Sequence, residues 1–266
     1  MGAGRMKRYG AITAAIALMF IVTACAEQRT GVLKVGVRDD IMNFGYFNEE
    51  TGQYYGMEID IANELADRLG YAETEFITVQ PDSRKEMLLD GKVDCVIAAY
   101  SIADTRKENF DFTEPYYTDH TRIMVETSSL IRTPQHLKNK TIGIVNGANA
   151  GPLLAEKLFE LSLITENIVS NSETETVYEG ARVLKAASYS ELSAYLEEGI
   201  VDAACMDSCI AGTYMDEGRA FLELSVAEQQ YGVATLKDCA LSKPIADAVR
   251  EMLDDGTIAG FIDKWD

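Results

Sequence analysis

The sequence predicts an α/β fold of two lobes, each with a mainly parallel sheet core and helices on both faces. Two observations carry this prediction. Short apolar runs alternate with amphipathic segments, which is the order of strands and helices in parallel α/β structure. This order then repeats once along the 266-residue chain, because Gly36 and Gly143 are 107 residues apart and Gly91 and Gly199 are 108 apart.

Each copy of the repeat consists of a strand, a helix, a second helix and a second strand. In the first copy these segments are residues 33–38, 57–70, 83–91 and 93–101. In the second copy they are residues 140–145, 151–161, 188–199 and 201–207. Both second helices stop at a glycine, where helices often end, and lead into a Val-Asp pair that opens an apolar strand. Simple alternation produces loose matches, but nearly equal offsets favour two lobes built on one plan.

The chain is expected to pass between the two lobes twice. Residues 224–236 return to a strand after the second copy, and residues 243–262 predict a last helix that begins near Pro244. The two passages form a two-strand hinge. We therefore predict a discontinuous first lobe and a continuous second lobe, with bounds 32–118 plus 230–266 and 119–229.

The composition argues against several classes of function. The chain has 24 Lys and Arg against 43 Asp and Glu, a formal net charge of −19. Nucleic acid is not expected as a partner, because phosphate binding needs a basic surface. Four cysteines follow residue 25, and neither their spacing nor the two histidines match a metal site. We expect no metal ion and no cofactor.

Residues 1–24 are expected to be an export signal. Three basic residues precede an uncharged run from Ala11 to Ala24, which is short for a membrane span. The small residues before Cys25 resemble a bacterial lipobox, so cleavage would leave a lipidated Cys25 at the start of a linker, residues 25–31. The acyl chains would hold the protein on the periplasmic or outer face of the cell membrane. The alternative is an ordinary signal peptide followed by an incidental cysteine.

Polar and small residues gather where four predicted strands end. In open α/β sheets, ligands bind beyond the carboxyl ends of the strands, and facing lobes would bring these ends together. The residues there are Arg38, Asp39, Ala99, Ser101, Ala148, Asn149, Ala150 and Asp207. Such a set of cationic, hydrogen-bonding and carboxylate groups suits a small zwitterion.

Arg106 adds a guanidinium group to this set. It follows SIADT, residues 101–105, so we place it in the first turn of a short helix, where its planar fork can bind a carboxylate. Each candidate has a structural alternative: Arg106 can be an exposed arginine, Asp207 can cap the next helix, and NGANAG, residues 146–151, can be only a turn. That loop offers free N–H groups to an anion but lacks the Lys and Ser/Thr of a P-loop.

Two stretches carry a family resemblance. AAYSIADTRKENFDFTEPYY, residues 98–117, and EQQYGVA, residues 228–234, resemble family 3 extracellular solute-binding proteins, the amino-acid receptors of bacterial ABC importers. The resemblance extends from LKVGV to FIDKW, and residues 45–70 look like the first lobe of this family. It implies the two-lobed, type II fold of periplasmic binding proteins, a free L-amino acid as ligand, and an ABC permease as partner. It also implies a monomer that closes at its hinge and catalyses nothing.

The resemblance also implies roles for the strand-end residues. Arg106 would bind the ligand α-carboxylate, and the Ser101 hydroxyl would assist it. The Ala99 carbonyl and the Asp207 carboxylate would accept hydrogen bonds from the ligand ammonium group. The helix-start amides of the family map onto Ala148, Asn149 and Ala150.

Two more arginines indicate which amino acid binds. Arg84 stands where several aspartate- and glutamate-binding relatives carry an arginine that reads the side chain, and Arg38 stands where neutral-ligand binders often carry Asp. An acidic side chain can pair with both cations, whereas a neutral one would leave buried charge uncompensated. We therefore expect L-glutamate or L-aspartate, with cystine next. The alternative for Arg84 is a solvent-facing position on its helix.

Two other classes of protein share this architecture. A prephenate or arogenate dehydratase-like enzyme would need an acid or base in the cleft, and both histidines map away from the predicted strand ends. A ligand-sensing domain of a membrane receptor would need a spanning helix and a signalling domain after residue 266. We expect a solute-binding lipoprotein in preference to either.

Overall fold

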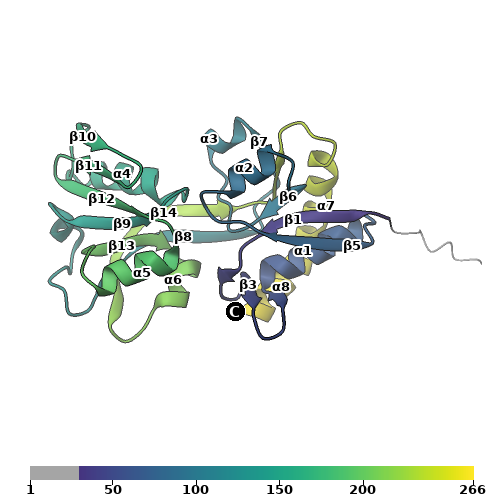
Figure 1. Cartoon of the computed structure of the whole chain (residues 1–266), viewed down its shortest axis with the longest axis horizontal. Coiled ribbons are helices and arrows are strands. Elements are labelled where there is room, and N and C mark those ends of the chain that lie inside the picture. Colours follow the sequence, from purple (N-terminus) through teal and green to yellow (C-terminus); the bar gives the residue numbers. More distant parts are fainter. Residues whose placement is uncertain (1–29) are drawn as a thin grey trace, which may run out of the picture.

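The computed structural model describes residues 30–266, which form two α/β lobes joined by two long strands (Figure 1). We call the body with a five-stranded sheet the first lobe and the body with a seven-stranded sheet the second lobe. The predicted export signal (1–24), Cys25 and most of the linker 25–31 lie outside the described residues. Within residues 30–266, no helix has the length and apolar character needed to cross a membrane.

The first lobe contains both ends of the described chain. Its strands are β1 (Val32–Val37), β2 (Asp40–Ile41), β3 (Gly45–Asn48), β4 (Gln53–Tyr55), β5 (Glu73–Thr78), β6 (Cys95–Ile97), β7 (Phe110–Phe112) and β15 (Ala234–Leu236). Its helices are α1 (Met57–Arg68), α2 (Arg84–Leu89), α3 (Asp104–Lys107), α7 (Ser242–Asp254) and α8 (Thr257–Trp265). The main sheet has the order β5-β1-β6-β15-β7, and β2, β3 and β4 form a small sheet of their own.

The second lobe is formed by the middle of the chain. Its strands are β8 (Tyr117–Glu126), β9 (Thr141–Val145), β10 (Ile168–Asn171), β11 (Glu175–Tyr178), β12 (Ala181–Ala186), β13 (Ala203–Asp207) and β14 (Arg219–Tyr231). Its helices are η1 (Pro134–Leu137, a 3₁₀ turn), α4 (Ala150–Glu160), α5 (Tyr189–Glu197) and α6 (Ser208–Tyr214). The sheet has the order β10-β11-β12-β9-β13-β8-β14.

The two sheets share one topology, which confirms the predicted repeat. In the first lobe β1 pairs in parallel with β5 and β6, and β6 pairs antiparallel with β15. In the second lobe β9 pairs in parallel with β12 and β13, and β13 pairs antiparallel with β8. The parallel centre of each sheet points its carboxyl ends the same way, so each lobe has one edge that can carry a ligand.

Two strands connect the lobes. β8 leaves the first lobe and β14 returns to it, and they pair antiparallel from Tyr117 with Tyr231 to Glu126 with Arg219. Figure 1 shows both strands running through the middle of the molecule. The two-strand hinge expected from sequence therefore takes the form of one continuous ribbon. The exact lobe bounds, with breaks at 118/119 and 229/230, fall inside this ribbon and stay a prediction.

The apolar periodicity of the sequence accounts for the packing of the first lobe. In β1, Leu33, Val35 and Val37 are fully buried, and in α1 the spacing of Ile61 and Leu65 puts both on one buried face. Burying one such side chain contributes about 1.5–3 kcal/mol. The same cluster includes residues of α7 and α8, which explains why the end of the chain returns to this lobe.

The last helix differs from the prediction. Residues 243–262 form parts of two helices, α7 and α8, because Gly256 between them has a left-handed φ of +81°. Glycine tolerates this conformation and ends helices for that reason. Pro244 is the third residue of α7, which starts at Ser242, so the expected first position is also wrong. The hairpin strands β10–β12 had no counterpart in the sequence-based assignment.

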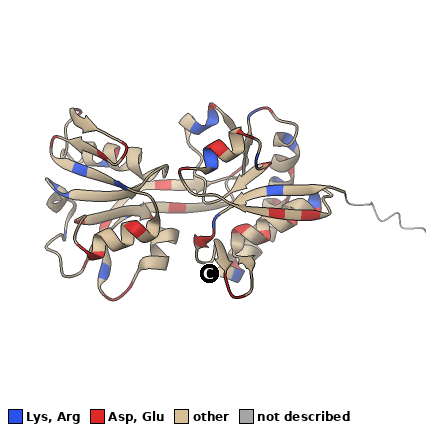
Figure 2. Cartoon of the chain, in the orientation of Figure 1, with Lys and Arg blue, Asp and Glu red and all other residues tan. Residues whose placement is uncertain are grey.

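The charges of the protein are not segregated by lobe. Figure 2 shows acidic and basic segments interspersed over both lobes, although acidic residues outnumber basic ones in the sequence. Most of the ion pairs recorded within residues 30–266 join partly exposed side chains, such as Lys107 with Asp104 and Arg250 with Glu114. Exposed pairs of this kind contribute little stability. The buried charges are therefore the informative ones.

We predict opposite effects for two alanine substitutions in the last helix region. Gly256→Ala should lower the free energy of unfolding by about 1 kcal/mol, because alanine is strained at a left-handed φ. Gly260→Ala should raise it by about 0.5–1 kcal/mol, because Gly260 lies inside α8 and the added methyl group would extend into open space. Urea unfolding measures both. Equal signs for the two variants would contradict this explanation of the helix break.

Candidate functional site

The carboxyl ends of the central strands of both lobes meet at the boundary between them. The guanidinium carbon of Arg38, after β1, lies 5.5 Å from the ring centre of Tyr189 in the second lobe. Nη2 of Arg106 in the first lobe donates a hydrogen bond to the Gly147 carbonyl in the second, at 3.4 Å. These contacts show that the two lobes are closed on each other around the predicted residues.

Arg84 and Arg106 are held at this boundary by backbone carbonyls. Arg84 begins α2, is 3% exposed, and donates Nη1 to the carbonyls of Ala98 and Ala99 at 2.7 and 3.3 Å. Arg106 lies in the short helix α3, as predicted, and donates Nη1 to the Ser101 carbonyl at 2.8 Å. Within residues 30–266 neither arginine has a carboxylate among its recorded hydrogen-bond partners. The solvent-facing alternative for Arg84 is wrong.

Arg38 is the most buried of the three cations. It is 1% exposed, and its Nη2 donates to the Asp40 carboxylate at 2.7 Å and to the Gln80 amide oxygen at 3.1 Å. Its Nε is buried without a hydrogen-bond partner in the described chain, and so is Nε of Arg84. An unpaired buried donor costs about 1–3 kcal/mol. A ligand oxygen at either nitrogen would remove that cost.

The neighbouring guanidinium groups also affect the pKa of Arg84. Burial, and then the positive charges of Arg106 and Arg38, lower the pKa of Arg84 to about 10. Burial likewise lowers the pKa of Arg106. Arg84 stays protonated at neutral pH. The protein therefore keeps several positive charges close together where they have little access to water. A carboxylate between them would reverse this unfavourable electrostatics.

Asp207 lies opposite, at the end of β13 in the second lobe. Its Oδ1 accepts a hydrogen bond from Thr121 Oγ1 at 2.5 Å, and its Oδ2 accepts one from the Tyr231 hydroxyl at 2.8 Å. It precedes α6 but makes no capping hydrogen bond to that helix, so the capping alternative is wrong. Burial raises the pKa of Asp207, against the lowering effect of its two hydrogen bonds.

The partners of Asp207 belong to the hinge. Thr121 is in β8 and Tyr231 ends β14, and Gln229 of β14 donates to Thr121 Oγ1 at 3.0 Å. Ser101, 2% exposed, forms an isolated backbone bridge with Tyr231. The hinge strands, the first-lobe residue Ser101 and the second-lobe residue Asp207 are therefore connected directly.

Ala99 occupies a strained backbone position beside Arg84. Its φ is +45°, in the left-handed region that costs an alanine roughly 1–2 kcal/mol. Its N–H donates to Oε1 of the fully buried Glu58 at 2.7 Å, and the Tyr116 hydroxyl donates to the same oxygen at 2.5 Å. Glu58 thus fixes the peptide whose carbonyl we expected to face the ligand. That carbonyl already accepts a hydrogen bond from Arg84.

Some polar groups of the second-lobe loop after β9 already make hydrogen bonds within the protein. The Ala148 N–H donates to the Val145 carbonyl at 3.2 Å, so this predicted amide is used within a turn. The Asn149 side chain donates to the Gln229 amide oxygen at 3.2 Å, which ties the loop to β14. Ala150 begins α4, where N–H groups have no acceptor inside the helix. Of the three predicted amides, that of Ala148 is therefore the one already bonded within the loop.

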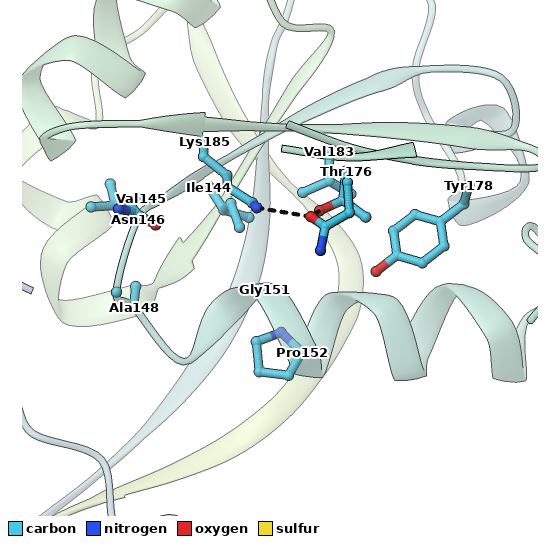
Figure 3. Close-up of a pocket in the computed structure, with 12 residues that line it drawn as sticks. Ile144, Val145, Asn146, Ala148, Gly151, Pro152, Thr176, Tyr178, Val183 and Lys185 are labelled. Carbon is cyan, nitrogen blue, oxygen red and sulfur yellow. Dashed lines mark hydrogen bonds between the residues drawn. The ribbon is translucent and has the colours of Figure 1, made fainter. Parts of the chain in front are cut away.

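A separate pocket of about 260 Å³ lies behind this loop (Figure 3). The sheet strands contribute Thr176, Tyr178 and Lys185, and the start of α4 contributes Gly151 and Pro152. Figure 3 shows the Lys185 ammonium group reaching under the sheet, and it donates to the Asn171 amide oxygen at 3.2 Å. None of the three arginines lines this pocket. It shares Gly147 and Ala148 with the interlobe boundary, so it adjoins the interlobe site.

Sequence reasoning missed several residues of the interlobe site. Tyr100 lies between the predicted Ala99 and Ser101 and is 2% exposed, and the strand-end rule could have included it. Tyr189 begins α5 and touches the site only because the lobes close, so no local signal marks it. Glu58 lies in α1, away from the strand ends in the sequence, so the strand-end rule does not reach it.

The comparisons with known proteins identify the family. The family description that matches residues 33–266 is bacterial extracellular solute-binding proteins, family 3. The chain therefore belongs to this family of amino-acid-binding proteins of ABC transporters. The expectations of a type II fold and of a binding protein in place of an enzyme are confirmed.

Individual relatives differ in ligand. The chain is 28% identical over 249 residues to the glutamine-binding protein of an ABC transporter of Bacillus subtilis (strain 168), which covers 91% of this chain and 84% of that protein. It is 26% identical over 280 residues to the L-cystine-binding protein of Escherichia coli (strain K12), covering 98% and 95%. Among solved structures, an ancestral arginine-binding protein bound to arginine has a TM-score of 0.74 and 28% identity, covering 89% and 99%.

We predict that Gly147→Ala blocks closure of the lobes. Gly147 has a φ of +75°, and a Cβ there would lie 2.4 Å from the Pro81 carbonyl oxygen of the first lobe. Ligand affinity should fall at least about tenfold, or 1.4 kcal/mol, and small-angle X-ray scattering should show a larger radius of gyration with ligand than wild type has.

The matched control is Gly70→Ala. Gly70 has a similar φ of +78° but no atom within 4 Å of the added carbon. It should lose a similar amount of folding stability and keep wild-type affinity. Equal affinity in the two variants would contradict the role of Gly147 in closure.

Proposed function

We propose that this protein captures a dicarboxylic L-amino acid, glutamate or aspartate, between its lobes for an ABC importer. The observation that carries this proposal is the presence of three arginines at the interlobe boundary, of which Arg38 and Arg84 are buried and Arg106 is half-buried. Arg84 and Arg106 have no carboxylate among their recorded hydrogen-bond partners in the described chain. A solute-binding protein needs no catalytic group at such a site. It needs charged groups that pair with opposite charges on a specific ligand.

The backbone of the amino acid would bind across the boundary. Arg106 and Ser101 would bind its α-carboxylate, together with the Ala150 amide at the start of α4. Asp207 would accept from its ammonium group, and the Ala99 carbonyl would assist. These groups come from both lobes, so the ligand would have its full set of partners only in the closed state.

The side chain would be selected by Arg38 and Arg84. Each has a buried Nε without a partner in residues 30–266, and a side-chain carboxylate can accept from both. Asp40 already pairs with Arg38, so a neutral ligand would leave the charge of Arg84 uncompensated and one or both Nε donors unpaired, which penalises it. An arginine or lysine side chain would add a further positive charge, so the ligand of the ancestral arginine-binding protein does not suit this site.

Cystine is the second candidate, and one observation favours it. The cystine-binding relative matches 98% of this chain, and the second carboxylate of cystine could use the same cations. Its second ammonium group would need another acceptor. Among the described residues, Asp40 is already bonded to Arg38, so glutamate and aspartate fit the charges better.

Closure by hinge motion has a quantitative requirement. Moving an open–closed equilibrium from 1:99 to 99:1 needs about 5.5 kcal/mol of differential affinity. Removing one partner of a desolvated charge pair typically costs about 2–5 kcal/mol. Two such pairs, one at each end of the ligand, are therefore sufficient in scale.

The membrane attachment and the partner complete the proposal. Lipidation at Cys25 would keep the protein at the outer face of the cell membrane, near an ABC permease that accepts the amino acid from the closed form. The protein would act as a monomer. The charge of −19 and the mixed surface of both lobes are consistent with an exported, water-exposed body.

Arg84→Met tests the side-chain assignment. Methionine keeps much of the volume and removes the charge, so glutamate affinity should fall about 30-fold or more, while glutamine affinity should change much less. Calorimetry with both ligands measures the ratio. Arg122→Met is the matched control, because Arg122 also stacks on an aromatic ring, at 4.3 Å from that of Phe221, but is outside the site. Unchanged glutamate affinity in Arg84→Met would refute the assignment.

Ligand affinity should also fall as the pH is lowered. The raised pKa of Asp207 means that its carboxylate takes up a proton at a higher pH than an ordinary aspartate. The ligand ammonium group binds the ionised form, so proton and ligand compete, and affinity is retained above this pKa and lost below it. Asp207→Asn should bind weakly with a flatter pH profile. Wild-type and variant profiles of the same shape would refute the role of Asp207.

Glu58 is the other carboxyl near this site whose pKa is raised by burial. It faces Ala99 and Tyr116 in place of the ligand. Glu58→Gln should therefore keep the pH dependence of the wild type, and calorimetry between pH 5 and 8 separates the two carboxyls.

A further inference from the structure

One tyrosine ring contacts two of the three arginines of the site. The guanidinium carbons of Arg84 and of Arg106 each lie 4.4 Å from the ring centre of Tyr100. Arg84 comes from α2, Arg106 from α3, and Tyr100 from the segment after β6. Two helices of the first lobe therefore each bring an arginine to one aromatic ring.

The ring is held in place from within the lobe. Tyr100 is 2% exposed, and its ring centre lies 6.2 Å from that of Phe110 and 5.5 Å from that of Phe112. Both phenylalanines belong to β7, at the edge of the main sheet. The position of the ring is therefore set by the core, and the ring in turn offers a fixed surface to the arginines.

Two guanidinium groups at one ring would repel each other if nothing opposed their charge. The charge of Arg106 contributes to the lowered pKa of Arg84. An aromatic face carries negative electrostatic potential and attracts cations, most strongly where water is excluded. Backbone carbonyls bind only part of each guanidinium group, at Ala98 and Ser101.

We propose that Tyr100 is a positioning residue that holds Arg84 and Arg106 together at the ligand site. This inference rests on the proposed function, since it assumes that Arg106 binds the α-carboxylate and Arg84 the side-chain carboxylate. The ring keeps the two cations at a fixed distance in the ligand-free protein. A ligand with two carboxylates then meets both without having to bring like charges together.

This role predicts selectivity for ligands with two carboxylates. Glutamate uses both arginines and should depend strongly on the ring, whereas glutamine uses Arg106 alone and should depend on it less. A ring that only fills space would affect both ligands equally. The electron density of the ring, independent of its size, is therefore the property to vary.

The experiment replaces Tyr100 by phenylalanine and by phenylalanines of increasing fluorine content. Fluorine withdraws electron density from the ring face while the ring keeps nearly the same shape. The pentafluoro analogue should bind glutamate at least about tenfold more weakly than Tyr100→Phe, with intermediate values between them. Glutamine affinity should fall no more than about threefold. Melting temperature of the ligand-free protein should change little along the series.

The control places the pentafluoro analogue at Phe112. This ring belongs to the same aromatic cluster, and within residues 30–266 no cation is recorded over it. Glutamate affinity should then stay at the wild-type value. An equal loss at both positions would show a general effect of fluorine and overturn the inference.

Different outcomes would overturn the role of Tyr100 and the proposed function. If wild-type protein binds glutamate or aspartate but affinity stays flat along the fluorine series, only the role of Tyr100 is overturned. If glutamate and glutamine lose affinity in parallel, the ring is structural and the role is again overturned. If the wild type binds neither acidic amino acid, the proposed function fails and this inference fails with it.

Discussion

The constraint on which the site depends is the placement of three guanidinium groups, two of them buried and one half-buried, where the two lobes meet. Removing a charge from water is costly unless an opposite charge or good hydrogen bonds replace the water. Asp40 and Gln80 do this for Arg38, and backbone carbonyls do it in part for Arg84 and Arg106. Under the proposed function, a negatively charged ligand would supply the charge that Arg84 and Arg106 still lack.

The fold allows a ligand at this boundary to bring the two lobes together. Both lobes repeat one topology, so their ligand-bearing edges can face each other, and β8 with β14 forms the connection. Asp207 is bonded to Thr121 on one hinge strand and to Tyr231 on the other. The group that would bind the ligand ammonium is thus attached to the hinge itself. Ligand binding at Asp207 would therefore be coupled to the hinge through these hydrogen bonds.

Sequence patterns predicted the elements whose positions depend on local periodicity. The repeated strands and helices have strong apolar patterns and glycine ends, and the strand-end rule located Arg38 and Asp207. The hairpin strands β10–β12 were missed because β10 is wholly exposed and shows no apolar alternation. Tyr189 and the engaged amide of Ala148 were missed because they depend on contacts between lobes and on turn geometry. Such features follow from assembled structure and not from spacing along the chain.

The central claim is that charge complementarity selects the ligand. A thermal-shift screen of all amino acids plus cystine, on protein refolded after removal of bound ligand, tests it directly, because a ligand stabilises the form it binds by RT ln(1 + [L]/Kd), which rises with affinity. The account predicts the largest rise in melting temperature with glutamate or aspartate. A larger rise with arginine, lysine or a neutral amino acid, or no rise with any of them, would contradict it.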